Sequence, residues 1–177
     1  MTTTTANAIL DGNLTLEDLS DMSVSELDLL YRQGTLPASM KVLDGTPEGR
    51  MLAVRGIEKT PLSGPIGFFS KASAFPWDGK SFKAISDNRG TGINRINLAV
   101  FKQEWFPFNT VVEPSVIDGK DCIYLDYDLP ENPWFIRKIR DELREVSAGL
   151  FLGPAMWKNG NGGATLVLWF AIDTDSR

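Results

Sequence analysis

Histidine is absent from this sequence of 177 residues. Its absence removes the commonest general base, the commonest metal ligand and every nucleophile that a histidine would activate. Because the chain also has a single cysteine, Cys122, a zinc site would need carboxylate or water ligands alone, which is a rare ligand set for zinc. We therefore expect no metal and no cofactor. Any acid–base chemistry would come from carboxylate, tyrosine and lysine side chains.

The single cysteine also excludes an intramolecular disulfide, which indicates a reducing compartment. No apolar run approaches the ~20 residues that a membrane-spanning helix needs. The N-terminal residues, Met1 to Thr5, are polar and lack the basic and apolar parts of a signal peptide. These absences predict a soluble, cytoplasmic protein that does not insert into a membrane.

A basic surface is missing as well. The chain has 18 Lys and Arg residues against 23 Asp and Glu residues, for a formal net charge of −5, whereas proteins that bind nucleic acid usually carry a basic patch. The densest basic stretch, residues 137–140, is followed at once by Asp141 and Glu142, so we interpret it as a solvated helix face. We expect no nucleic-acid partner.

The composition that is present is that of a globular protein, with 42% hydrophobic and 23% charged residues. The length fits one domain. Residues 1–22 are predicted to form a partly flexible N-terminal arm, which Leu14, Leu16 and Leu19 could anchor on the body. Residues 23–177 are predicted to form a single domain.

Two segments have helical patterns. Ser23 and Glu26 form a capping box at the start of a short amphipathic helix that covers residues 23–34. A second helix is expected over residues 132–149, because Pro133 is in the first helical position and apolar residues follow at helical spacing.

Most of the remaining chain has the pattern of strands separated by turns. The strands are expected at residues 51–55, 80–86, 93–101, 105–112, 121–128, 150–158 and 164–173. Residues 61–77, rich in Gly, Pro and Ser, could be a lid or a short helix over the core. Short connections favour a mainly β fold, an antiparallel lipocalin-like β-barrel of about seven or eight strands with one short N-terminal helix and one helix inserted before the last two strands. A curved sheet wrapped on a helix is the alternative.

Four polar residues raise the question of which strand faces point inward. Arg95 and Asn97 share one strand face, and Tyr124 and Asp126 share another. If the apolar faces form the core, all four point outward. In the alternative they line a wet cavity, where Arg95 and Asp126 would pair because an unpaired buried charge is costly. There Tyr124, Asp126 and Arg95 are the candidate catalytic residues.

Large aromatic side chains are concentrated in the second half of the chain. Each one alone is best explained as part of the core, but we expect one or two to line a ligand site, because such sites are mostly apolar with few polar groups. The candidate ligand-binding residues are Trp77, Asn97, Trp105, Phe108 and Trp157.

The segment Trp77-Asp78-Gly79-Lys80-Ser81-Phe82 resembles the W-x-G-K-x-F core of the small bacterial proteins named for a GXWXG motif. Residues 123–158 resemble the C-terminal half of those proteins, which has a strand ending in acidic and proline residues, a connecting segment with Arg-Lys and a Gly-Leu-containing strand. Phe75 stands where the first glycine of the motif belongs. The resemblance implies a lipocalin-like (calycin-like) barrel of largely unassigned function, and it carries over no catalytic residue.

Three functions remain open at this point. The first is a binding module that holds a small hydrophobic molecule in a barrel cavity. The second is a cofactor-free isomerase, cyclase or hydratase that acts there on a lipid-like substrate or one from specialised metabolism, with positioning as the main source of rate. The third is an interaction protein that contacts a partner through its acidic surface and N-terminal arm. A homodimer is compatible with each of them.

Overall fold

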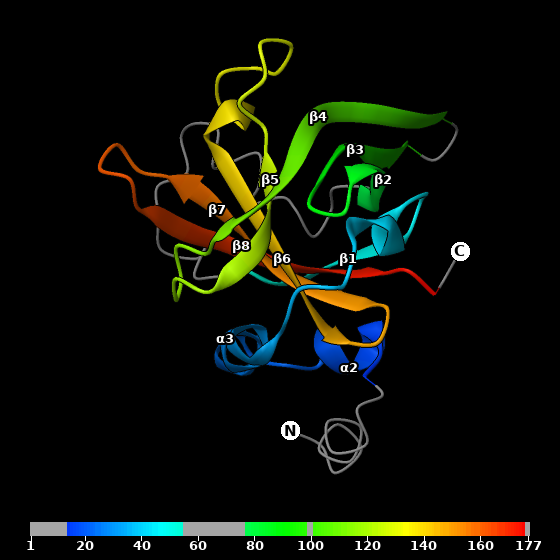
Figure 1. Ribbon diagram of the computed structural model, residues 1–177, viewed down its shortest axis with the longest axis vertical. Helices are drawn as coiled ribbons and strands as arrows, with labels where there is room; N and C mark the ends of the chain where they lie inside the picture. Colours follow the sequence, from blue (N-terminus) through cyan, green and yellow to red (C-terminus); the bar gives the residue numbers. More distant parts are fainter. Residues whose placement is uncertain (1–13, 55–76, 99–100, 176–177) are drawn as a thin grey trace.

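The computed structural model describes residues 14–54, 77–98 and 101–175, and its eight strands form a closed barrel (Figure 1). Each strand pairs antiparallel with the next one in the sequence, and the last pairs with the first. The strands are β1 (Glu48–Val54), β2 (Trp77–Ser86), β3 (Arg89–Leu98), β4 (Phe101–Pro114), β5 (Asp121–Asp126), β6 (Ile139–Ser147), β7 (Leu150–Lys158) and β8 (Ala164–Asp173). The expected antiparallel barrel is therefore confirmed, and β7 and β8 have the predicted bounds.

The helix predicted over residues 132–149 is wrong. A short 3-10 helix, η4 (Ile136–Lys138), leads there into the strand β6. The apolar residues Ile136, Ile139 and Leu143 have helical spacing, but Ile139 and Leu143 also fit one face of a strand. Pairing of β6 with β5 and β7 decides between the two patterns, as tertiary context often overrides local preference.

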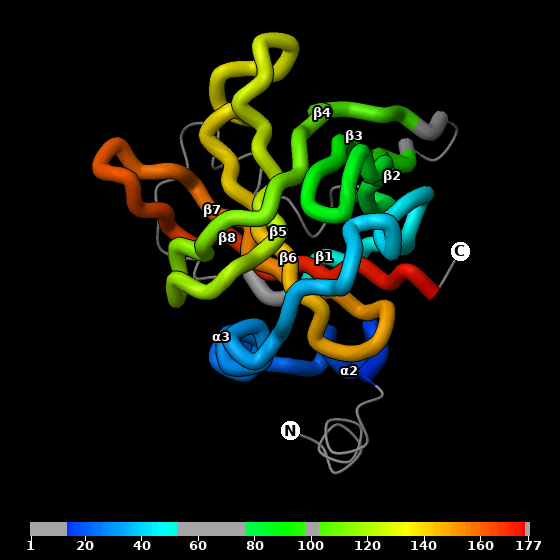
Figure 2. The backbone as a smooth tube through the Cα atoms, viewed as in Figure 1, coloured from blue at the N-terminus to red at the C-terminus, as the bar shows by residue number. Residues whose placement is uncertain are grey.

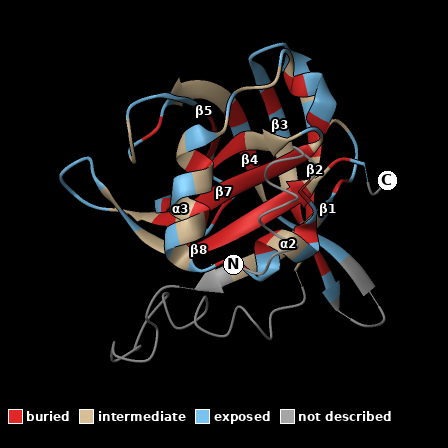
Figure 3. Ribbon diagram, turned by 90° about the horizontal axis from the view of Figure 1, so that it is seen from below, coloured by how far each residue is buried: buried red, intermediate tan, exposed pale blue. Residues whose placement is uncertain are grey.

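The N-terminal part carries two α-helices in the described residues, α2 (Leu16–Ser20) and α3 (Val24–Gln33). The helix α3 begins with the predicted capping box of Ser23 and Glu26. Leu14, Leu16 and Leu19 are buried in one cluster with Leu152 and Trp169, so these three residues anchor the described part of the arm on the barrel, as expected. Figure 3 shows α2 and α3 lying along the barrel next to the largely buried strands β7 and β8.

Strands β7 and β8 separate two hydrophobic clusters. Phe151 and Phe170 point into the barrel, whereas their neighbours Leu152 and Trp169 point outward and pack under the helices. The first half of β7 and the second half of β8 are therefore buried on both faces. Figure 2 shows that the chain leaves the barrel in the connection between β7 and β8 and in the segment between β5 and β6.

The barrel closes with a very close approach of two glycines. In the described residues β1 pairs with β2 at Glu48 and Gly79, and a Cβ atom on Gly49 would overlap the backbone of Gly79. Gly79 itself has a φ of 106°, a conformation that favours glycine. A short 3-10 helix, η1 (Met40–Leu43), lies between α3 and β1 in the sequence, and its residues Met40 and Leu43 are buried.

Almost all of the segment predicted as a lid, residues 61–77, lies outside the described residues. In the part of the chain that the structure does describe, no helix is both long enough and apolar enough to cross a membrane.

Candidate functional site

The site begins with an irregularity in strand β2. The register of β2 against β3 shifts between Trp77 and Gly79, and the positive φ of Gly79 accommodates this bulge. In a regular strand, residues three apart point to opposite faces. Because of the bulge, Trp77 and Lys80 both line the interior of the barrel.

Lys80 is the centre of a buried polar cluster. Its ammonium nitrogen Nζ donates to Asn94 Oδ1 at 2.8 Å, to the Tyr127 hydroxyl at 2.7 Å and to Asp141 Oδ2 at 3.0 Å. An ammonium group has three N–H donors, so these acceptors use all of them. The side chains of Lys80 and Asp141 are 4% and 5% exposed, which makes their contact a buried ion pair.

Aromatic rings surround the same ammonium group. Nζ lies 5.0 Å from the ring centroid of Phe170, 5.3 Å from that of Phe108, and 5.4 Å from those of Trp77 and Tyr127. These distances are within the range of cation–π attraction. The rings thus replace part of the hydration that Lys80 gives up inside the barrel.

Burial changes the acid–base properties of the cluster. It lowers the pKa of Lys80, while the charge of Asp141 opposes this shift. Burial also raises the pKa of Tyr127, and the nearby Asp141 carboxylate raises it further. Tyr127 therefore stays protonated and donates to Asp141 Oδ2 at 2.9 Å. A lysine with a lowered pKa beside a phenol and a carboxylate is a group of residues that can transfer protons.

A cavity of about 80 Å³ adjoins this cluster inside the barrel. Its wall is mainly apolar, with Met51, Ile96 and Leu168 among the lining residues, and its polar side chains all belong to the cluster. Since one water needs roughly 10–15 Å³ of such space, the cavity has room for several waters or one small organic molecule. Asp141 Oδ1 is fully buried in the cluster and has no hydrogen-bond partner in the described residues.

The predicted ligand-binding residues divide into three groups. Trp77 lines the cavity, and the ring of Phe108 contacts the Lys80 ammonium group. Trp157 packs against the interior hydrophobic cluster without lining the cavity. Trp105 is 37% exposed, and Asn97 is exposed as well, so neither lies at this site.

The candidate catalytic residues lie outside the cavity. Tyr124 donates to Asp126 Oδ1 at 2.7 Å, and the ammonium of Lys158 donates to Tyr124 at 3.1 Å, on the outer face of β5. Arg95 donates instead to two backbone carbonyls, those of Pro47 and Asp78. The structure thus agrees with the outward alternative, and a wet cavity lined by Arg95, Asn97, Tyr124 and Asp126 is not present.

Sequence reasoning missed the four polar residues of the actual cluster, which are Lys80, Asn94, Tyr127 and Asp141. Asn94 and Tyr127 each share a strand face with apolar residues, and this polar interruption of an apolar face was the available signal. Lys80 is part of the W-x-G-K-x-F segment. Asp141 was assigned to a solvated helix face, so its position could not be recognised.

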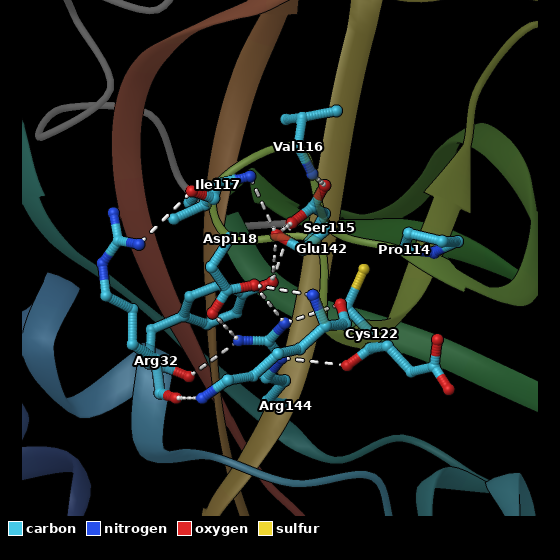
Figure 4. A network of polar contacts seen from close by, with 12 residues as sticks. Arg32, Pro114, Ser115, Val116, Ile117, Asp118, Cys122, Glu142 and Arg144 are labelled. Atoms are coloured by element: carbon cyan, nitrogen blue, oxygen red, sulfur yellow. Dashed lines mark hydrogen bonds and ion pairs between the residues drawn. The ribbon is translucent and has the colours of Figure 1, made fainter.

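A second buried network lies on the outer face of β6, and it is structural (Figure 4). Both carboxylate oxygens of Glu142 accept hydrogen bonds, one from Arg140 and one from Tyr31. Arg144 donates to both carboxylate oxygens of Asp118, each at 2.8 Å, and to three backbone carbonyls. Because all these groups have protein partners, the network fastens the β4–β5 loop and α3 to the barrel and leaves none of them free for a ligand.

No grouping of three or more Cys, Asp or Glu side chains that could hold a metal ion is found in residues 14–54, 77–98 and 101–175. The cluster around Lys80 contains one carboxylate and one ammonium, which is not a metal-ligand set.

Comparison with known proteins gives a fold but no function. No protein family matches the chain. A solved structure of a protein from Thermomonospora curvata is similar, with a TM-score of 0.54 and 16% identity over 95% of this chain and 93% of that one. Protein translocase subunits SecD from Rickettsia felis and Rickettsia conorii are each 35% identical over 71 residues, which is 40% of this chain. The match spans 13% of the SecD length.

Proposed function

We propose that this protein binds a small, mostly apolar molecule in the cavity of its barrel. The observation that supports the proposal most strongly is an apolar cavity whose polar groups are confined to one buried cluster around Lys80. Sites for small molecules have this composition, in which apolar walls supply affinity and a few polar groups fix orientation. The cavity of about 80 Å³ is smaller than the ~150 Å³ cavity that holds benzene in another protein, so it suits a molecule of a few heavy atoms, or a single ring if the lining side chains shift, rather than a long acyl chain.

The test uses a probe of suitable size, fluorobenzene, whose binding is followed by fluorine NMR. Saturable binding to the wild-type protein is expected. Ala155→Leu should abolish it, because Ala155 lines the cavity and the added carbons fill it. Ala148→Leu is the matched control, since Ala148 is exposed and lies in the β6–β7 turn. Absence of saturable binding, or equal binding to both variants, would refute the proposal.

Native mass spectrometry of the freshly purified protein provides an independent test, since a natural ligand can copurify. A bound mass should be present in the wild type and in Ala148→Leu, and missing in Ala155→Leu. A mass retained by Ala155→Leu would show that the ligand occupies another place.

A second candidate function is a cofactor-free isomerase, cyclase or hydratase that works in the same cavity. It is favoured by the hydrogen-bonded group of Lys80, Tyr127 and Asp141, with the lowered pKa of Lys80 and the raised pKa of Tyr127. Such pKa shifts by burial are characteristic of acid–base sites, although structural ion pairs also cause them. Proton transfer would then use these residues instead of Tyr124, Asp126 and Arg95.

The enzyme candidate is tested by incubating extracts of small molecules with the protein and searching for new products. A product has the same mass as its substrate after isomerisation or cyclisation, and differs from it by one water after hydration. The conversion should be lost in Tyr127→Phe, which removes one hydroxyl, and kept in Tyr124→Phe, which removes the hydroxyl on the outer face. Conversion that survives Tyr127→Phe would eliminate this mechanism.

A further inference from the structure

Strand β4 is much longer than β5, its neighbour on one side. It has 14 residues against the six of β5, which pairs only with the segment Asn109–Pro114. The first part of β4 therefore extends past β5, with β3 paired along its other side (Figure 1). In the part of the chain that the structure describes, no strand pairs with the β5 side of residues 101–105. The barrel is closed, yet it keeps one open stretch of strand edge.

This open edge is also exposed on both of its faces. Gln103, Glu104 and Trp105 are all exposed, and consecutive residues of a strand point to opposite faces. Glu104 accepts a hydrogen bond from the Ser81 hydroxyl, but the bond is long, at 3.4 Å, and lies at the surface. The loop after β5 meets β4 further along the strand, at the Pro107 carbonyl. An uncovered strand edge of this kind can pair with another extended segment.

The sequence of the open edge is complementary to itself. It reads Lys102-Gln103-Glu104, with a positive and a negative residue on either side of a neutral one. When two copies pair antiparallel with their Gln103 residues opposite each other, the register places Lys102 opposite Glu104 of the partner subunit. The two-fold axis then repeats this contact, so two pairs of opposite charges face each other across the strands. The same register places Trp105 opposite Phe101 of the partner subunit, and aromatic cross-strand pairs add to the stability of a sheet.

We infer that this protein forms a homodimer by antiparallel pairing of residues 101–105 of β4 with the same residues of a second copy. The matching of charges within one short segment favours a second copy over a different protein, because each half of the edge supplies the partner of the other half. The interface is small, so the dimer is weak and forms as the concentration rises. The inference concerns a surface outside the cavity and is independent of the proposed binding function.

The experiment measures self-association by sedimentation equilibrium over a wide range of protein concentrations. A reversible equilibrium between monomer and dimer is expected for the wild type. Lys102→Glu and Glu104→Lys should each weaken it about tenfold or more, because each substitution turns both cross-strand pairs into like charges. Asp121→Lys is the matched control, since it makes the same change of charge as Glu104→Lys at an exposed residue of β5 that pairs with the other end of β4. It should dimerise like the wild type.

Two combinations restore the complementary charges and so exclude a general effect of each substitution. In a mixture of Lys102→Glu with Glu104→Lys, one copy has two glutamates where the other has two lysines, and a heterodimer at least as tight as the wild-type dimer should form. The double variant Lys102→Glu/Glu104→Lys has the charges exchanged and should regain the homodimer. Circular dichroism checks that every variant is folded.

Three results would overturn the inference. The first is a wild type that stays monomeric at every concentration, which would leave the edge to an extended segment of another protein. The second is a dimer that both single variants form as tightly as the wild type, because the contact would then lie on another surface. The third is a failure of the mixture and of the double variant to restore association, since the charges would not face each other in the proposed register.

Discussion

Lys80 on β2 and Asp141 on β6 face each other across the interior of the barrel, with Nζ and Oδ2 3.0 Å apart. The two strands are not neighbours in the sheet, so the pair spans the inside of the barrel and not a strand ladder. The attraction between the charges is set against the cost of removing both from water. Each charge is consequently tolerated only while the other is present.

This dependence predicts strong coupling between the two residues. Lys80→Met and Asp141→Leu should each lower the free energy of unfolding by about 3–5 kcal/mol, because each leaves one buried charge unpaired. The double variant should lose much less than the sum of the two, since no charge remains unpaired. Urea unfolding of the three variants and the wild type measures the coupling, and additive losses would show that the pair is not energetically linked.

The three tyrosines of the chain should all resist ionisation in the folded protein. Burial raises the pKa of Tyr31, Tyr124 and Tyr127, with nearby carboxylates adding to the shift. Raised folded-state pKa values give stability that is fully present below the unfolded pKa of about 10 and is lost as the pH rises above it. Phenolate absorbance should therefore stay absent at about pH 11 and then appear together with unfolding.

The control for the tyrosine titration is the same protein in concentrated urea, where phenolate should form with an ordinary midpoint near pH ~10. If any tyrosine of the folded protein titrated with that midpoint, its buried environment would be disproved.

Cys122 should be unreactive in the folded state. Burial raises the pKa of its thiol to about 12, and the thiolate is the reactive form. An aromatic disulfide reagent at neutral pH should modify the native protein only at the rate of unfolding, and the urea-unfolded protein within the dead time of mixing. Rapid, stoichiometric reaction of the native protein would contradict the buried position.

Replacement of Arg144 by lysine should be far more damaging than its conservative nature suggests. Arg144 is fully buried and donates to Asp118 through two nitrogens, which a lysine cannot reproduce. We expect Arg144→Lys to destabilise the fold by about 3 kcal/mol. Thermal and urea unfolding give the value.

Arg137→Lys is the matched control for Arg144→Lys. Arg137 pairs with Asp128 at 2.6 Å, but the side chains are 44% and 52% exposed. Exposed ion pairs contribute about 0–1 kcal/mol, so this variant should be close to the wild type. Equal effects of the two substitutions would mean that the buried network has no special role.

The barrel could be predicted from the sequence because its signals are local. Asp118-Gly119 and Asn159-Gly160 mark connections between strands, and mainly apolar runs on either side of the second turn mark β7 and β8. Strand β6 was not predicted because its apolar spacing also fits a helix, and the charges of residues 137–142 suggested a solvated helix face. Glu142 and Arg144 on this strand have Tyr31 and Asp118 as partners, which are recognisable only once the barrel and α3 are assembled.

The candidate site could not be predicted for a related reason. Lys80 and Asp141 are 61 residues apart in the sequence and meet only because the barrel closes. The inward direction of Trp77 together with Lys80 depends on the bulge at Gly79, which local propensity does not reveal. The cluster contains lysine, tyrosine and aspartate, the residue types that the composition leaves available for acid–base chemistry, together with asparagine.

The double burial of β7 and β8 has a consequence for how the chain is made. Phe151 and Phe170 belong to the interior cluster, while Leu152 and Trp169 pack against the helices α2 and α3, and all four come long after these helices in the sequence. Because the ribosome makes the chain from its N-terminal side, α2 and α3 wait for the partner on which they pack. Stalled or truncated chains that end before residue 150 would expose both apolar surfaces at once and would be substrates for chaperones or proteases.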